Sequence, residues 1–217
     1  MNKYLKLSIL FFAVFIAFTI LVITVDVQAI GPNGSEVGFA TINKAVFEAF
    51  GQNNFFYVLT ELLGKTAILV CVIFGCVGAY QLFTRKSLMK VDKKIVYLGI
   101  FYIIVIAFYV VFNKVVVNYR PILEADGSLE ASYPSSHTVL AICVFITAFM
   151  QKQLNPKGTK QEEKVNVLLS IILPVIMLVG RLLAGIHWFT DIIPCSVSQL
   201  NNDVQLFLGT TIKFLKA

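Results

Sequence analysis

His137 and His187 are the only histidines in the chain, and each lies in a segment whose residue types suit phosphate chemistry. His187 precedes Asp191 by four residues, a spacing that puts both side chains on one face if a helix begins between them. The carboxylate would then accept a hydrogen bond from one ring nitrogen, which fixes the tautomer and leaves the other nitrogen free as a nucleophile or base. The spacing therefore predicts a histidine activated by an aspartate.

Cationic side chains accompany this pair. Arg181 lies six residues before His187, with Gly185 between them, so its guanidinium is able to fold back over the same point. Arg120 supplies a second guanidinium, and the planar fork of arginine suits a tetrahedral oxyanion. Lys114 has two readings, a phosphate ligand or a lysine at a helix end that extends toward the membrane surface.

The sequence PSSH at residues 134–137 is predicted to open a helix, whose free backbone N–H groups favour an anion. His137 at this position is able to protonate a leaving oxygen. Ser135 is either a helix cap or a phosphate ligand, and Ser136 is either structural or a further hydroxyl for phosphate. Because no carboxylate cluster for Mg²⁺ accompanies them, these residues predict phosphoryl transfer through a phosphohistidine, with no metal or other cofactor.

The three blocks resemble the motifs of the type 2 phosphatidic acid phosphatase family, KxxxxxxRP, PSGH and SRxxxxxHxxxD. Here they read KVVVNYRP (114–121), PSSH (134–137) and RLLAGIHWFTD (181–191). The resemblance implies a six-helix membrane phosphatase that acts without metal on lipid phosphates, with its active site on the outer side. It implies these catalytic roles: His187 as nucleophile, Asp191 as its orienting acid and His137 as general acid. It implies phosphate binding by Arg120, Ser135 and Arg181.

The chain departs from these motifs at several points. Lys114 lies six residues before Arg120 instead of seven, and Asn113 occupies the family's lysine position. Ser136 stands where the family prefers glycine, and Gly180 where it prefers serine. The tail, residues 192–217, is polar where the family generally continues into an apolar last helix, and polar side chains facing lipid are costly.

The composition places these motifs in a membrane. Of 217 residues, 58% are hydrophobic and only 14% are charged, whereas soluble chains carry about a quarter charged residues. A disordered protein, a disulfide-stapled module and a water-soluble enzyme are thereby excluded. The four cysteines lack metal-ligand spacing and are expected to be buried, inert thiols. The net charge of +6 does not indicate nucleic acid, because the basic residues do not interleave with aromatic ones.

Apolar runs predict an all-α polytopic bundle of about six transmembrane helices, since about 20 apolar residues cross the hydrocarbon layer. The clear runs cover residues 7–25, 67–83 with an extension from 55, 95–112, 138–150 and 165–183. The sixth, residues 191–212, is weak because polar side chains interrupt it. The first run has a second reading as a secretory signal, although its apolar core exceeds the roughly 7–15 residues usual there.

The distribution of lysine and arginine predicts that both termini are cytoplasmic. The basic clusters assigned to the inner side cover residues 3–6, 85–94, 152–164 and 213–216. The basic residues left outside are Lys44, Lys65, Lys114, Arg120 and Arg181. Residues 30–54 are expected on the outer side, as an amphipathic helix or a plain loop. One domain fills residues 1–217, with the motif core at 114–191.

Three further groups have structural readings. Glu61 and Lys65 are expected to pair along one helix. An acidic loop is expected to be solvated: Glu124, Asp126 and Glu130. An interfacial aromatic belt is expected from Tyr119, Tyr133 and Trp188.

We therefore expect a membrane-embedded phosphatase for lipid phosphate or diphosphate esters such as undecaprenyl diphosphate, phosphatidate or phosphatidylglycerol phosphate. Its partners would be the lipid substrate and the bilayer. Two alternatives remain open at this point. One is a phosphatase or phosphotransferase for a soluble phosphate ester, and the other is a non-catalytic membrane protein that binds or passes anions.

Overall fold

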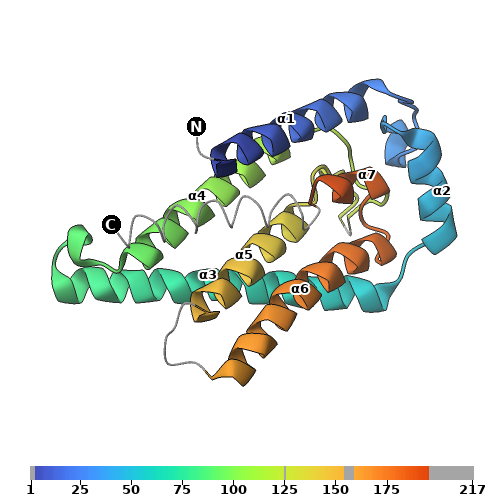
Figure 1. Cartoon of the computed structure of the whole chain (residues 1–217). Coiled ribbons are helices and arrows are strands. Elements are labelled where there is room, and N and C mark those ends of the chain that lie inside the picture. Colours follow the sequence, from blue (N-terminus) through green and yellow to red (C-terminus); the bar gives the residue numbers. More distant parts are fainter. Residues whose placement is uncertain (1–2, 125, 154–158, 196–217) are drawn as a thin grey trace.

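The computed structural model describes residues 3–124, 126–153 and 159–195, which form the helical bundle of Figure 1. The long helices are α1 (Lys3–Thr24), α3 (Asn54–Arg85), α4 (Lys93–Lys114), α5 (Ser136–Gln153) and α6 (Lys160–Leu183). The short ones are α2 (Ala40–Phe50) and α7 (Phe189–Ile192). Single 3₁₀ turns occur at Pro32–Gly34, Leu88–Lys90 and Ile193–Cys195. The predicted all-α membrane fold class is confirmed.

Three helices within the described ranges, α3, α4 and α6, are long and apolar enough to cross a membrane. The predicted extension of the second run from residue 55 is real, because α3 is one continuous helix of 32 residues. Shorter apolar stretches lie in α1 (Ile9–Thr24) and in α5 (Ser136–Phe149). The sixth predicted span begins with α7 and the turn at Ile193–Cys195, and from residue 196 onward it lies outside the described residues.

The helix boundaries follow from local sequence. Asn53 caps α3, because its side chain accepts hydrogen bonds from the backbone N–H groups of the first turn. Asp92 caps α4 in the same way. Thr159 and Glu162 form a capping box at the start of α6, in which each side chain accepts from the other residue's backbone. Polar residues that stop one apolar run and start the next thus define the predicted spans.

Helix α5 is the centre of the bundle and packs against α3, α4 and α6. Its residues 141–147 are all buried, and a core cluster joins it to these neighbours through Ala67, Leu98, Tyr102 and Met177. Small residues allow close approach between α3 and α6. A Cβ atom added to Gly180 would lie only 2.6 Å from Cγ2 of Thr60. The serine that the family motif prefers at residue 180 would not fit against Thr60.

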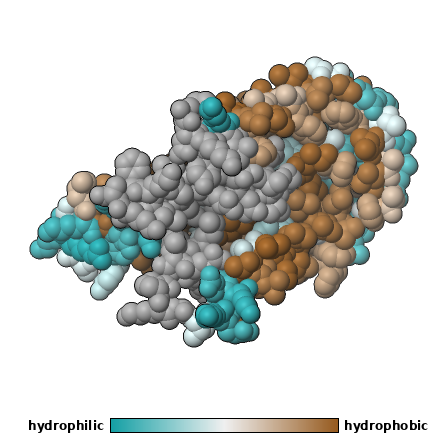
Figure 2. Space-filling view, in the orientation of Figure 1, coloured by the Kyte–Doolittle hydropathy of each residue, from teal (hydrophilic) through white to brown (hydrophobic). Residues whose placement is uncertain are grey.

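Because consecutive long helices alternate in direction, the motif segments meet at one end of the bundle. The start of α5, the end of α6 and the loop 115–135 gather near α7 and α2 (Figure 1). The turn between α3 and α4, which carries the basic cluster of residues 85–94, lies at the opposite end. Figure 2 shows hydrophilic residues at that turn and at the start of α6, and apolar surface over much of the rest of the coloured face.

Helix α2 is the helix expected in residues 30–54, and it is attached to the motif region through Asn43. This side chain is fully buried; its Nδ2 donates to the carbonyl of Gly38 and to Oγ1 of Thr190, each at 2.8 Å. The backbone N–H of Thr190 donates in return to Oδ1 of Asn43. The plain-loop reading of this segment is wrong, since α2 is held against α7 by these bonds.

The predicted aromatic belt is wrong for Trp188 and Tyr133, which are only 3% and 1% exposed. Nε1 of Trp188 donates to the carbonyl of Tyr119 at 2.7 Å, and the hydroxyl of Tyr133 contacts Oγ1 of Thr19 at 2.8 Å. The polar tips of both rings are therefore satisfied inside the protein, which removes the reason to place them at a water interface.

Candidate active site

The side chains predicted to do the chemistry gather where α5, α6, α7 and the loop 115–135 meet. Both histidines and both arginines lie close enough for the charge of one to act on the others. Asp191 contacts the segments of the chain that carry these residues.

Asp191 is fully buried and bound by three segments. Its Oδ2 accepts from the backbone N–H of Trp188 at 2.8 Å, and its Oδ1 accepts from Nδ2 of Asn118 at 3.1 Å. Its own carbonyl accepts from the backbone N–H of Ser135 at 3.1 Å. The carboxylate is therefore immobilised by the α6–α7 junction and the loop 115–135, and its backbone is tied to the start of α5.

His187 faces this carboxylate, with 3.9 Å between its Nδ1 and Oδ2 of Asp191. That distance is longer than a hydrogen bond, so the two side chains are close together but are not hydrogen-bonded. Both ring nitrogens are buried without a hydrogen-bond partner among the described residues. Burial lowers the pKa of His187 below its ordinary value, against the opposing effect of Asp191. The imidazole is thus neutral, with a lone pair available for bonding.

Arg181 lies in the last turn of α6, and its side chain is only 1% exposed. Its Nη2 donates to Oε1 of Glu61 on α3 at 2.9 Å. The predicted pairing of Glu61 with Lys65 is therefore wrong, because Glu61 turns across to the neighbouring helix. The buried Nε of Arg181 has no partner among the described residues, which leaves a donor for a ligand.

Arg120 is held by acids of its own loop. Its guanidinium forms ion pairs with Glu124 and, at 2.9 Å, with Oε2 of Glu130. The expectation that these two glutamates only solvate the loop is wrong. Asp126 instead accepts from the backbone N–H of Ser128 within the loop. Arg120 also keeps a buried Nε without a partner in the described structure.

The start of α5 places Ser135, Ser136 and His137 differently. Ser135 is fully buried, and its hydroxyl contacts Oγ1 of Thr138 at 2.7 Å. Ser136 and His137 line a cavity. His137 packs on α3 at Gly64, where an added Cβ would lie 3.1 Å from its Cδ2. In the PSSH segment the hydroxyl of Ser135 is therefore buried, whereas Ser136 and His137 face the cavity.

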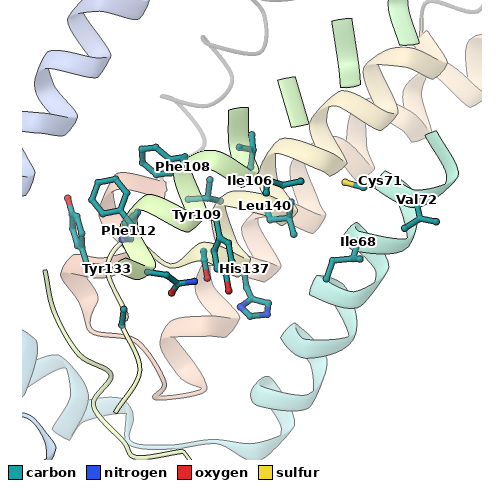
Figure 3. Close-up of a pocket in the computed structure, with 16 residues that line it drawn as sticks. Ile68, Cys71, Val72, Ile106, Phe108, Tyr109, Phe112, Tyr133, His137 and Leu140 are labelled. Carbon is teal, nitrogen blue, oxygen red and sulfur yellow. The ribbon is translucent and has the colours of Figure 1, made fainter. Parts of the chain in front are cut away.

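The cavity has a volume of about 430 Å³ and lies between α3, α4 and α5. Figure 3 shows His137 between Tyr109 of α4 and Ile68 of α3, with an otherwise largely apolar lining. Asn113 lines this cavity, whereas Lys114 is exposed at the end of α4 and forms no ion pair with a described residue. The departure seen in the first motif is therefore a real change at the site, from lysine to a neutral amide.

The described cysteines are free thiols. The expectation that all of them are buried is wrong. Cys143 and Cys195 are buried, but Cys71 is partly exposed and Cys76 is exposed on the apolar surface. Sγ of Cys195 lies 3.5 Å from the carbonyl of Asp191 and 3.7 Å from that of Ser135, so it packs behind the site. No group of three or more His, Cys, Asp or Glu in the described ranges is arranged to hold a metal.

Two residues of this arrangement escaped sequence reasoning. Asn118 binds the Asp191 carboxylate, and its only sequence signal was a polar side chain inside the first motif. Glu61 binds Arg181, and its signal was an acid within an apolar helix, which is costly without a partner. Both contacts join residues far apart in the chain, 73 and 120 positions respectively.

Residues 114–197 match the family model of the PAP2 superfamily. A solved structure, "Crystal structure of the first transmembrane PAP2 type phosphatidylglycerolphosphate phosphatase from Bacillus subtilis", is similar over 98% of each chain, at 20% sequence identity and a TM-score of 0.59. No curated protein matches the sequence.

The bundle is that of a membrane protein, and its fold is similar to that of a solved PAP2-type phosphatase. Segment 114–197 of the chain matches the PAP2 superfamily, the family that the three motifs resemble.

Proposed function

We propose that this protein is a metal-independent membrane phosphatase that hydrolyses lipid phosphate or diphosphate esters through a phosphohistidine intermediate. The observation that carries the proposal is the buried pair of His187 and Asp191 beside Arg120 and Arg181. A neutral imidazole, an immobilised carboxylate and two guanidinium groups supply a nucleophile and the cationic clamps for a phosphoryl transition state.

In the proposed first step, Nε2 of His187 attacks the terminal phosphorus while the P–O bond to the leaving group breaks, an ester bond in a monophosphate and an anhydride bond in a diphosphate. His137 donates a proton to the leaving oxygen, and Asp191 stabilises the positive charge that develops on the ring of His187. Arg120 and Arg181 bind the non-bridging oxygens, with Ser135 as a further ligand. In the second step water attacks the phosphohistidine, His137 takes a proton from that water, and inorganic phosphate leaves.

A lipid substrate is favoured over a soluble ester by the cavity beside His137. Its walls are largely apolar and are formed by three helices, so an acyl or prenyl chain would fill it while its phosphate reaches the histidines. A sugar or nucleotide phosphate would leave these walls uncovered. The similar solved structure is that of a phosphatidylglycerolphosphate phosphatase, which also favours a lipid.

We place the site on the outer face of the cell membrane, with both termini in the cytoplasm. The support is the basic cluster at residues 85–94, which lies at the end of the bundle opposite the site. Lysine and arginine are retained on the cytoplasmic side of membranes. An accessibility assay with cysteines introduced at residue 127 or residue 89 would test this orientation, and labelling of residue 89 from outside would contradict it.

The activity is tested by phosphate release from undecaprenyl diphosphate, phosphatidate and phosphatidylglycerol phosphate in detergent micelles containing EDTA. We expect release by the wild-type protein, and none by His187→Ala at comparable folding. Loss of activity with the chelator, or survival of activity in His187→Ala, would contradict the mechanism. Preference for soluble esters would favour a phosphatase or phosphotransferase for soluble substrates. Phosphate binding without turnover would favour a non-catalytic membrane protein that binds anions.

A further inference from the structure

Helix α3 contains one acidic residue, Glu61, in a largely apolar stretch that also holds Lys65. An ionised carboxyl group within such a helix is costly and needs a partner. The partner is Arg181, at 2.9 Å between Oε1 and Nη2. Glu61 lies outside residues 114–197, the segment that matches the family, and it belongs to none of the three motifs.

The environment of Arg181 explains why a carboxylate is needed there. Its side chain is 1% exposed, and a buried guanidinium without a counter-charge is strongly unfavourable. Glu61 satisfies Nη2, whereas the buried Nε is left without a partner among the described residues. One nitrogen of the fork is thus anchored while a second is available to a phosphate oxygen.

The face of α3 that carries Glu61 is shaped by its neighbours. Thr60 packs on Gly180, where no Cβ would fit, and Gly64, about one turn further along α3, packs on His137. The two close contacts fix α3 against both α6 and α5. The packing of α3 against α5 and α6 therefore holds the carboxylate of Glu61 next to Arg181.

We infer that Glu61 is a positioning residue, which holds the Arg181 guanidinium in the orientation that binds the substrate phosphate. The inference rests on the proposed function in one respect, that Arg181 binds phosphate. It extends the phosphate site from the motif segments into α3. The opposite role, a carboxylate that merely occupies Arg181 until phosphate displaces it, predicts tighter phosphate binding when Glu61 is neutralised.

The first test is Glu61→Gln in the full chain, with inorganic phosphate binding measured by calorimetry on detergent-purified protein. We expect phosphate affinity to fall about tenfold, the range of one charged hydrogen bond, and kcat/KM for lipid phosphate to fall by a similar factor. Glu61→Asp keeps the charge and should recover part of both losses. Glu48→Gln is the matched control, because among the described residues Glu48 forms an ion pair with exposed Lys44 alone, at 3.9 Å, and it should change neither quantity.

The second test separates positioning from a general structural role. In an Arg181→Ala background, Glu61→Gln should cause no further loss of phosphate affinity, because its effect acts through Arg181. Additive losses in the double variant would overturn the inference, as would tighter phosphate binding in Glu61→Gln. If Glu61→Gln does not fold, Glu61→Asp serves instead, and unchanged phosphate affinity in that variant overturns the inference.

The two proposals fail in different ways. Wild-type protein that binds phosphate but releases none from lipids contradicts the proposed function, while the binding measurements on Glu61 variants still decide the inference. Wild-type protein that hydrolyses lipid phosphate, with Glu61→Gln equal to wild type, contradicts the inference alone. Wild-type protein that neither binds nor releases phosphate contradicts both.

Discussion

The α6–α7 junction (residues 181–191) and the loop 115–135 both supply side chains to the site, but they are built differently. In the junction, residues 184–188 and 190–191 are all buried, and their partners come from α2, α5 and the loop. In the loop, residues 126–128 are exposed, and Arg120 is held by Glu124 and Glu130 of the same loop. The first region is positioned by the whole fold. The two ends of the loop are also held by distant residues, but its middle, which carries Arg120, is held largely by its neighbours in sequence.

This difference indicates that the two regions contribute unequally to catalysis. A buried group held by distant elements is already oriented before substrate arrives, and such preorganisation is the main source of electrostatic catalysis. Ion pairs that water reaches contribute little to orientation, typically below about 1 kcal/mol. We therefore expect changes in the junction to cost more than equivalent changes in the loop.

The largest contrast is expected between the two arginines. Arg181→Ala should lower kcat/KM by about 100- to 1,000-fold, the usual effect of removing a preorganised donor, because Glu61 holds this buried guanidinium in place before substrate arrives. Arg120→Ala should lower it only about tenfold, since the loop is able to rearrange. Phosphate release from micellar lipid phosphate measures both. A larger loss in Arg120→Ala would reverse the comparison.

Two glycines with positive φ provide a matched pair for stability. Gly185 in the junction has φ +69, and an added Cβ would lie 2.4 Å from the carbonyl oxygen of Gly51; Gly127 in the loop has φ +80 and open space around it. Gly185→Ala should reduce the free energy of unfolding by about 2–4 kcal/mol, and Gly127→Ala by about 1 kcal/mol, from backbone strain alone. Thermal unfolding in detergent measures the difference, and equal losses would contradict it.

Asn118 connects the two regions, because its Nδ2 donates to Asp191 from the base of the loop. Asn118→Leu removes this bond and leaves Oδ1 of Asp191 without that donor, so kcat/KM should fall about tenfold. Ser128→Ala at the exposed end of the loop should leave kcat/KM within about twofold of the wild-type value. If the Asn118 variant keeps full activity, Asp191 is oriented by the Trp188 backbone alone.

The pH dependence tests the burial of the junction directly. Because burial lowers the pKa of His187, the neutral nucleophile persists to lower pH, and the acid limb of kcat/KM should lie below the ordinary histidine range. Unfolded protein binds this proton at higher pH than folded protein. Stability attributable to His187 is therefore complete above the unfolded pKa and is lost as the pH falls toward the folded pKa. An acid limb at or above the ordinary range would show that water reaches the ring.

The smallest effect is expected at Lys114, at the edge of the loop. Lys114→Ala should lower kcat/KM less than about threefold, because the exposed lysine forms no ion pair with a described residue and Asn113 lines the cavity instead. The same phosphate-release assay applies. A loss equal to that of Arg181→Ala would mean that the lysine stem reaches the substrate despite its shifted position.

Much of this protein was predictable from local sequence. Apolar runs identified α1, α3, α4, α5 and α6, since helix formation and membrane burial depend on residues close together in the chain. The pattern of residues 30–54 favoured a helix, and α2 formed there. The motifs identified the histidines and arginines as candidates, because residue types that suit phosphate chemistry recur in three short segments of an apolar chain.

The partners of those residues were decided by tertiary structure alone. Arg181 meets Glu61 and not a neighbour, Asp191 meets Asn118, and Trp188 is buried instead of lying at an interface. Each contact depends on how closely two helices or a helix and a loop approach, which residues such as Gly180 permit. Sequence by itself therefore predicted which groups are candidates for the chemistry, and packing determined which groups hold them, because the distance between helices is a property of the assembled bundle.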